Sequence, residues 1–176
     1  MPRINSAVEL EELRKGLLSK KDPLKPRIAI CAGTGCLGLG NDRVISAFEE
    51  EVRKNSLEVK VDIRVTGCHF FCEKGPLVVI YPEEICYIQV TPQDAPEIVA
   101  QTIIGKKVID RLVYTDPKTG EKAVHESEIP FYKYQMRLLT GDNGKIDPRS
   151  IEDYLAIGGY SALAKVLQTM SPEQIV

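Results

Sequence analysis

The 176-residue sequence lacks a strong excess of charge, a long apolar run and an apolar leader segment. It has 23 Lys and Arg against 25 Asp and Glu, so it lacks the strongly basic composition that binding to a nucleic-acid backbone needs. No apolar run approaches the roughly 18 residues that a membrane-spanning helix requires. Residues 1–21 alternate charges with leucines and contain no apolar signal core. We therefore expect a cytoplasmic protein, free or at the periphery of a membrane complex, that binds no nucleic acid and does not insert into a bilayer.

The sequence also lacks the short motifs of several enzyme classes. It contains no P-loop, no Gly-x-Ser-x-Gly and no His-Glu-x-x-His. Residues 33–38 spell Gly-x-Gly-x-x-Gly, but Cys36 falls inside this segment, and a loop that holds a metal cluster cannot also hold a pyrophosphate. We find no candidate catalytic acid, base or nucleophile in this chain.

The hydrophobic fraction of 43% is typical of a globular protein, and the length fits one domain with an appendage. Hydrophobic periodicity and glycine and proline positions predict a β-α-β-β-β-α order, typical of a small α/β domain. Asn41 or Asp42 is expected to cap the second helix. The expected elements are a helix at 4–20, a strand at 27–32, a glycine-rich loop at 31–40, a helix at 41–55, a strand at 59–65, a cysteine loop at 66–75, strands at 76–81 and 85–90, and a helix at 94–104.

The last third of the sequence is a connector followed by predicted helices at 131–139, 147–156 and 160–167. Ser171 to Gln174 has the signals of a helix start, with a Ser cap, Pro in the first turn and Gln three residues after the cap. A natural domain seldom ends while beginning a helix, so we expect the chain to be the front part of a longer protein. The predicted divisions are an N-terminal helix and connector at 1–25, an α/β domain at 26–105, and a connector and truncated helical segment at 106–176.

Two pairs of cysteines carry the chemistry. Cys31 and Cys36 enclose four residues, and Cys68 and Cys72 enclose three. Both pairs follow a predicted strand, and the carboxyl ends of strands are where α/β sheets usually bind ligands. Four cysteines on two such loops can converge on a 2Fe–2S cluster, which takes two thiolates per iron.

Glycines surround these cysteines at Gly33, Gly35, Gly67 and Gly75. A loop around a bulky anionic centre needs unusual backbone angles and amides that point at sulfur. Glycine provides both, because it has no Cβ and tolerates positive φ. We therefore expect these four glycines to contribute to cofactor binding.

Zinc binding and thiol–disulfide chemistry remain open alternatives at this point. Zinc also takes four cysteines, and redox pairs are usually Cys-x-x-Cys, which neither pair matches. The spacings favour iron–sulfur over both. Cys86 stands in an apolar run and is expected to be a core residue. His69 either donates to a cluster sulfur or lines its loop, and Phe70 and Phe71 either shield the cluster or pack on the sheet.

Two regions of the sequence resemble known proteins. Cys31-Ala-Gly-Thr-Gly-Cys36 and Thr66-Gly-Cys-His-Phe-Phe-Cys-Glu-Lys-Gly-Pro76, with the following Val-Val-Ile-Tyr-Pro82, resemble the thioredoxin-like 2Fe–2S ferredoxin domain. The later region looks like the lead-in to the NADH-binding flavoprotein subunit of complex I-like dehydrogenases, NAD-dependent (including electron-bifurcating) hydrogenases and NAD-dependent formate dehydrogenases. The stretches that carry this second resemblance are 129–135, 144–148, 151–154 and 158–163.

The resemblance implies an α/β thioredoxin-like 2Fe–2S ferredoxin domain with a leading helix and a trailing helical segment. It implies that Cys31, Cys36, Cys68 and Cys72 are metal ligands. The implied function is one-electron transfer between the flavin of an NADH-oxidising or NAD-reducing module and a partner cluster or ferredoxin. FMN, NAD and a 4Fe–4S cluster are expected only in a following part of the protein, so this chain alone should not oxidise NADH. The implied partners are the rest of the flavoprotein and the other subunits of an oxidoreductase complex.

Relatives often carry a small residue, commonly glycine, at the position of Phe70. If that position needs a positive φ, a phenylalanine there is strained.

Overall fold

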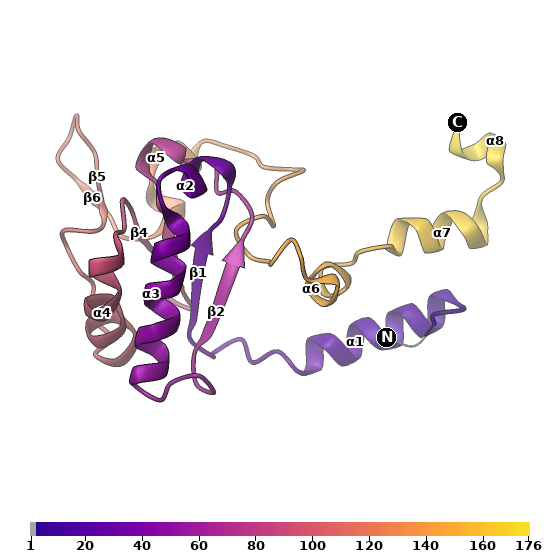
Figure 1. Ribbon diagram of the computed structural model, residues 1–176. Helices are drawn as coiled ribbons and strands as arrows, with labels where there is room; N and C mark the ends of the chain where they lie inside the picture. The colour runs from indigo at the N-terminus through magenta and orange to yellow at the C-terminus, as the bar shows by residue number, and fades with distance from the viewer. Residues whose placement is uncertain (1–2) are drawn as a thin grey trace. The chain divides into compact units, whose positions relative to one another are not determined.

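A computed structural model describes residues 3–176, which separate into two compact units. The larger comprises residues 23–147, and the smaller combines residues 3–22 with residues 148–176 (Figure 1). Within the described residues, no helix is both long enough and apolar enough to cross a membrane.

The larger unit is built on a four-stranded mixed sheet with the order β2-β1-β3-β4. β1 runs parallel to β2, whereas β3 is antiparallel to both β1 and β4. The close spacing of the third and fourth predicted strands therefore reads correctly as a hairpin. The strands are β1 (Arg27–Cys31), β2 (Asp62–Thr66), β3 (Val78–Tyr81) and β4 (Ile85–Tyr87).

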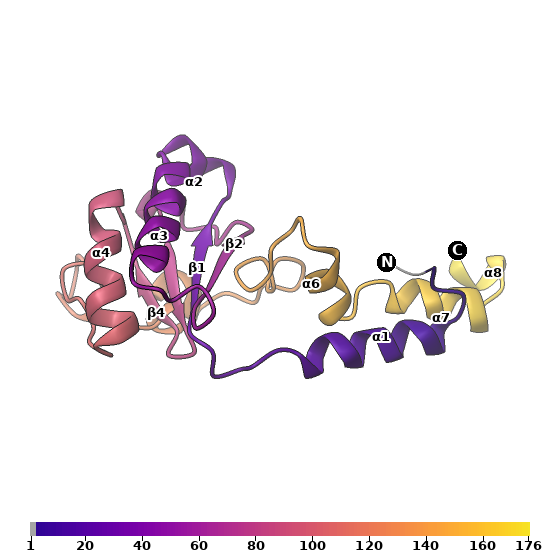
Figure 2. The ribbon, with the colours of Figure 1, turned by 60° about the horizontal axis from the view of Figure 1, so that its bottom comes forward.

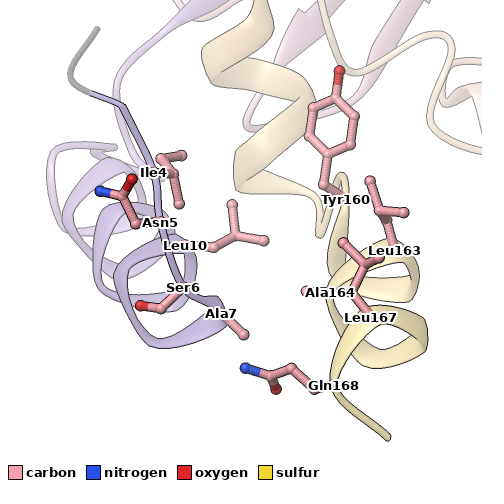
Figure 3. A pocket seen from close by; sticks show the side chains of 10 residues that line it. All are labelled: Ile4, Asn5, Ser6, Ala7, Leu10, Tyr160, Leu163, Ala164, Leu167 and Gln168. Carbon is pink, nitrogen blue, oxygen red and sulfur yellow. The ribbon is translucent and has the colours of Figure 1, made fainter. Parts of the chain in front are cut away.

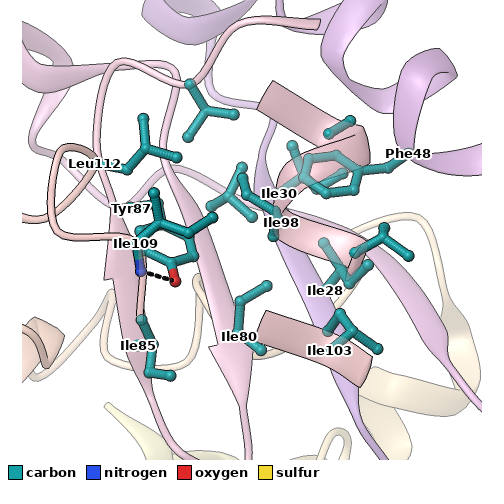
Figure 4. Packing of buried hydrophobic residues seen from close by; sticks show 14 of the residues in the cluster. Ile28, Ile30, Phe48, Ile80, Ile85, Tyr87, Ile98, Ile103, Ile109 and Leu112 are labelled. Atoms are coloured by element: carbon teal, nitrogen blue, oxygen red, sulfur yellow. Dashed lines mark hydrogen bonds between the residues drawn. The ribbon is translucent and has the colours of Figure 1, made fainter. Parts of the chain in front are cut away.

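Two helical segments cover one face of this sheet (Figure 1, Figure 2). Ile28 and Ile30 of β1 point to this face and pack with Phe48 (Figure 4). Tyr87 is fully buried there, and its hydroxyl accepts a hydrogen bond of 3.1 Å from the amide of Ile109. The segments are α3 (Asn41–Lys54) and α4 (Ala95–Glu97), the latter preceded by a 3₁₀ turn (Pro92–Asp94) and continued by a π-helical stretch (Ile98–Ile104).

The opposite face of the sheet is covered by the chain from residue 114 onward. Ala29 and Cys31 of β1 point to this face, where they belong to one apolar cluster with Ile129 and Tyr132. This later segment therefore completes the core of the larger unit. Its elements are β5 (Tyr114–Thr115) and β6 (Lys122–Ala123), which pair antiparallel, a 3₁₀ turn (Glu126–Glu128) and α5 (Pro130–Lys133).

Several predicted boundaries in the larger unit are wrong. The residue before α3 is Gly40, with φ of 83°, and the side chain of Asn41 instead donates a hydrogen bond of 2.6 Å to the carbonyl of Cys31. The predicted glycine-rich loop contains a short helix, α2 (Thr34–Gly38). β2 begins at Asp62 rather than at residue 59 and shows no alternation of buried and exposed residues, because it is an edge strand. The helix predicted at 131–139 is only the four-residue α5.

The smaller unit consists of helices. Ser6 caps α1 by accepting a hydrogen bond of 3.2 Å from the amide of Glu9. α6 begins at Ile151 rather than at the predicted residue 147, because Ser150 provides its cap. The predicted helix start at Ser171 is confirmed by a capping box with Gln174. The helices are α1 (Ala7–Ser19), α6 (Ile151–Ala156), α7 (Ser161–Thr169) and α8 (Pro172–Ile175).

A cavity of about 480 Å³ lies in this unit between the start of α1 and α7. Figure 3 shows Leu10 of α1 across from Leu163 and Leu167 of α7. The leucines of α7 are more than half exposed, at 51% and 77%, so this cavity is open rather than a packed core.

Candidate metal centre

The four paired cysteines lie at one edge of the sheet. Cys31 is the last residue of β1, and Cys36 follows in α2. Cys68 comes two residues after β2, and Cys72 begins a 3₁₀ turn (Cys72–Lys74). Because β1 and β2 are adjacent and parallel, with Cys31 opposite Thr66, their following loops leave the sheet side by side.

Their side chains form two interacting pairs, Cys31 with Cys36 and Cys68 with Cys72. All four are free cysteines; Cys31 and Cys36 are buried, Cys68 is half-buried and Cys72 is exposed. Among residues 3–176, no group of three or more His, Cys, Asp or Glu side chains is placed to hold a single metal ion. Two pairs of thiols are the donor set that two irons take in a 2Fe–2S cluster.

The pKa values of the first pair, Cys31 and Cys36, are shifted in opposite directions. The hydrogen bond from Cys36, together with amide donors and against the effect of burial, lowers the pKa of Cys31 to about 5. The same hydrogen bond and burial raise the pKa of Cys36. Cys31 is therefore a thiolate near neutral pH, which is the form of cysteine that binds metals.

Three of the four predicted glycines leave space for the sulfurs. A Cβ on Gly33 would stand 2.8 Å from Sγ of Cys68, and one on Gly75 would stand 2.8 Å from Sγ of Cys36. A Cβ on Gly35 would stand 3.1 Å from Sγ of Cys72. These approaches are closer than ordinary contacts, so any side chain here would displace a cysteine.

The expected conformational role of these glycines is wrong. None of Gly33, Gly35, Gly67 and Gly75 has a positive φ. Gly67 moreover approaches no cysteine sulfur, since its Cβ would stand 3.2 Å from the carbonyl oxygen of Asn143. Of the two reasons for expecting glycine, the missing Cβ is confirmed at Gly33, Gly35 and Gly75, and the positive φ is found at none of the four.

Backbone amides point at the sulfurs. The amide of Phe70 donates to Sγ of Cys68 at 3.2 Å. The amides of His69 and Gly33 act to lower the pKa of Cys31, and the amide of Leu77 acts to lower that of Cys36. Such bonds stabilise negative charge on sulfur and tune the potential of an iron–sulfur cluster. The donor set, the narrow glycine positions and these amides fit a bound 2Fe–2S group.

The two phenylalanines differ in role. Phe71 is buried and stacks on Phe131 with ring centroids 4.6 Å apart, so it packs over the second face of the sheet. Phe70 is 43% exposed and has a φ of 68°, which is the positive φ for which phenylalanine is poorly suited.

His69 is buried, with 1% of its surface exposed. Its Nε2 lies 3.0 Å from Oγ1 of Thr66, and its Nδ1 lies 3.1 Å from Oε1 of Glu126. Burial raises the pKa of the Glu126 carboxyl, but the hydrogen bond from His69 and the charges of His69 and Arg137 outweigh it and lower that pKa. Sequence reasoning missed Glu126, because 57 residues separate it from His69 and no motif connects them.

Cys86 takes no part in the centre. It is 1% exposed in β4, opposite Val79, and burial raises the pKa of its thiol. The predicted core role is therefore confirmed.

Comparison with known proteins gives four results. Residues 17–102 match a family described as thioredoxin-like [2Fe-2S] ferredoxin. A 2Fe-2S ferredoxin of Clostridium pasteurianum is 36% identical over 77 residues, which are 44% of this chain and 76% of that protein. The NADP-reducing hydrogenase subunit HndC of Solidesulfovibrio fructosivorans is 54% identical over 44 residues, which are 25% of this chain and 9% of that protein. Among solved structures, a thioredoxin-like [2Fe-2S] ferredoxin of Aquifex aeolicus is 31% identical, with a TM-score of 0.48, and the match covers 54% of this chain and 94% of that one.

Proposed function

The chain belongs to the thioredoxin-like [2Fe-2S] ferredoxin family, and from this premise we propose that Cys31, Cys36, Cys68 and Cys72 hold its cluster. A 2Fe–2S cluster takes up and returns one electron, so the chain is an electron-transfer protein. The observation that carries the ligand assignment is the meeting of two thiol pairs on loops that leave adjacent parallel strands.

The four cysteines differ in their exposure to solvent, and this difference indicates where electrons enter and leave. Cys31 and Cys36 lie on the buried side, and Phe71 with its stacked neighbour Phe131 excludes water there. Cys72 is exposed and Cys68 is half-buried. Electrons therefore enter and leave on the side of Cys68 and Cys72, where a partner can approach most closely.

Iron content tests the ligand assignment. The chain purified without oxygen should contain about two irons, absorb visible light and give the EPR signal of a reduced 2Fe–2S cluster after dithionite. Cys36→Ser and Cys68→Ser should lower the iron content or change the spectrum, whereas Cys86→Ala should do neither. One zinc per chain would instead establish a zinc site. A metal-free chain that cannot be reconstituted with iron and sulfide, and that forms a disulfide, would establish a thiol switch.

We also propose that this carrier works within an NADH dehydrogenase-type or NAD-dependent hydrogenase flavoprotein subunit. The partial match with HndC and the resemblance of residues 129–163 to a flavoprotein lead-in support this context. In this context the chain relays electrons between a flavin and a partner cluster or ferredoxin. The partners are the remaining flavoprotein module and the other subunits, which would hold FMN, NAD and a 4Fe–4S cluster.

An anaerobic reduction assay tests the context. NADH or NADPH alone should leave the visible absorption of the chain unchanged. Adding a purified NAD(P)H-oxidising flavoprotein of the hydrogenase type should bleach it, faster than an equal amount of free FMN does. Bleaching by NADH alone, at a rate proportional to the concentration of the chain, would contradict the proposal, and so would equal rates with the flavoprotein and with free FMN.

A further inference from the structure

Residues that lie beyond the family match contact the second cysteine loop. The match ends at residue 102, yet residues 126–144, here called the covering segment, contact the chain around Cys68. The amide of Gly67 donates to the carbonyl of Asn143 at 2.8 Å. Gly144 lies so close to the His69 ring that a Cβ there would stand 2.6 Å from Cε1. The covering segment therefore packs directly on the residues that flank Cys68.

His69 is the central contact of this packing. Its ring lies between Thr66 and Glu126, within hydrogen-bond distance of both. Thr66 donates in turn to the carbonyl of Ile30 at 3.2 Å, which ties the ring to β1. On the other side, Glu126 faces the guanidinium of Arg137 at 3.9 Å. The ring is thus fixed from the sheet and from the covering segment together.

The backbone at the same place supplies an amide to the second thiol pair. The amide of Phe70, the residue that follows His69, donates to Sγ of Cys68 at 3.2 Å. Because His69 and Phe70 are adjacent in the chain, fixing the ring of His69 also restrains the direction of this donor. Hydrogen bonds to cluster sulfurs stabilise the added negative charge of the reduced state.

We propose that the covering segment is part of the redox site and acts through His69, a positioning residue that holds the amide of Phe70 against Cys68. This inference rests on the proposed ligand assignment. It adds that the midpoint potential of the chain depends on residues 126–144, which contribute no ligand.

A double-mutant cycle in the full chain tests the inference. His69→Ala should retain about two irons, lower the midpoint potential and change the EPR g values, because the amide of Phe70 loses its fixed direction. Glu126→Ala should shift the potential in the same direction by a smaller amount, and it should add no further shift in the His69→Ala background. A direct charge effect of Glu126 would have the opposite sign, since removing a negative charge raises the potential, and it would persist in both backgrounds.

Glycine substitutions provide an independent test that removes neither the His69 ring nor the Glu126 carboxylate. Gly144→Ala should displace the ring of His69 and lower the potential. Gly38→Ala should not, because a Cβ at Gly38 has no atom within 4 Å, although Gly38 lies in the first ligand loop. Should His69→Ala fail to fold, Glu126→Ala and Gly144→Ala decide the matter.

The outcomes separate this inference from the ligand assignment. Unchanged potentials and EPR spectra in Glu126→Ala and Gly144→Ala, at full iron content, would overturn the role of the covering segment and leave the four ligands standing. Full iron content and an unchanged spectrum in Cys36→Ser and Cys68→Ser would overturn the ligand assignment itself.

Discussion

At the scale of single residues, Phe70 combines a φ of 68° with a ring that is 43% exposed. Non-glycine residues pay about 1 kcal/mol or more for this left-handed conformation. We expect Phe70→Gly to be more stable to unfolding than Phe70→Ala by about 1 kcal/mol, because both lose the ring and only alanine keeps the strain. Chemical denaturation of the two variants measures the difference. Equal stabilities would mean that the loop relaxes to a negative φ.

Gly33 offers a second prediction at this scale. A Cβ there would meet Cβ and Sγ of Cys68 at 2.8 Å and its Cα at 3.2 Å, so the backbone itself is in the way. Gly33→Ala should therefore reduce the iron content of the purified chain. Gly38→Ala, at the other end of the same loop, is the matched control and should bind iron as the wild type does. Normal iron content in both would show that the two loops can separate without loss of the centre.

The sequence and the structure agree on these residues to different degrees. The approach of the two cysteine loops is predictable, because both loops follow predicted strands; the ligand role of the four cysteines stays a proposal. The glycines are predictable in position, but their role as space rather than as φ depends on how closely the second loop approaches the first. The pairing of His69 with Glu126 was not predictable, since only the folded chain brings residues 57 apart into contact.

At the scale of elements, Asp94 connects Thr91, at the start of the second helical segment, to Arg111. Its carboxylate accepts hydrogen bonds of 2.7 Å from the amide and the hydroxyl of Thr91, and it pairs with Arg111 at 2.7 Å. Burial raises the pKa of Asp94, but the hydrogen bonds from Thr91 and Arg111 outweigh it and hold the pKa below its ordinary value.

A depressed pKa in the folded state means that the ionised carboxylate stabilises the fold at pH values above the pKa of the unfolded chain. This stabilisation is lost as the pH falls through about 4 toward the folded pKa. Asp94→Asn should be less stable than wild type by about 1 kcal/mol at neutral pH. The difference should narrow as the pH falls to about 3, as thermal unfolding at the two pH values can measure. A constant difference would assign the effect to geometry rather than to charge.

Element identity was easier to predict than element ends. The four strands of the main sheet and the two helical segments that cover it follow from apolar patterns, and each is present. The predicted cap of α3 is wrong, because Gly40 rather than Asn41 or Asp42 precedes the helix, and the predicted start of α6 is too early, because Ser150 caps it. α5 ended early because the residues from 134 to 139 are largely exposed and have no core to pack against.

At the scale of the whole molecule, burial is uneven between the units. α1 and α7 contain no buried residue, whereas α3 buries Val44, Phe48 and Val52. Regions with few buried contacts open at a lower free energy than the core does. We expect hydrogen exchange in α1 and α7 to be about tenfold faster or more than in α3, a helix of similar length to α1. Mass spectrometry of peptic fragments measures this. Equal protection of α1 and α3 would contradict the prediction.

The alternation of side chains along β1 restricts the insertions and deletions that this protein can tolerate in evolution. Ile28 and Ile30 belong to the helix-covered core, while Ala29 and Cys31 belong to the other face, and Cys31 is a proposed ligand. A one-residue insertion or deletion within the strand would exchange the two faces. It would place the thiol among the helices and an isoleucine at the cysteine loops. The apolar core and the proposed redox centre therefore depend on the same alternation of side chains within β1. A change in the length of the strand would disturb both.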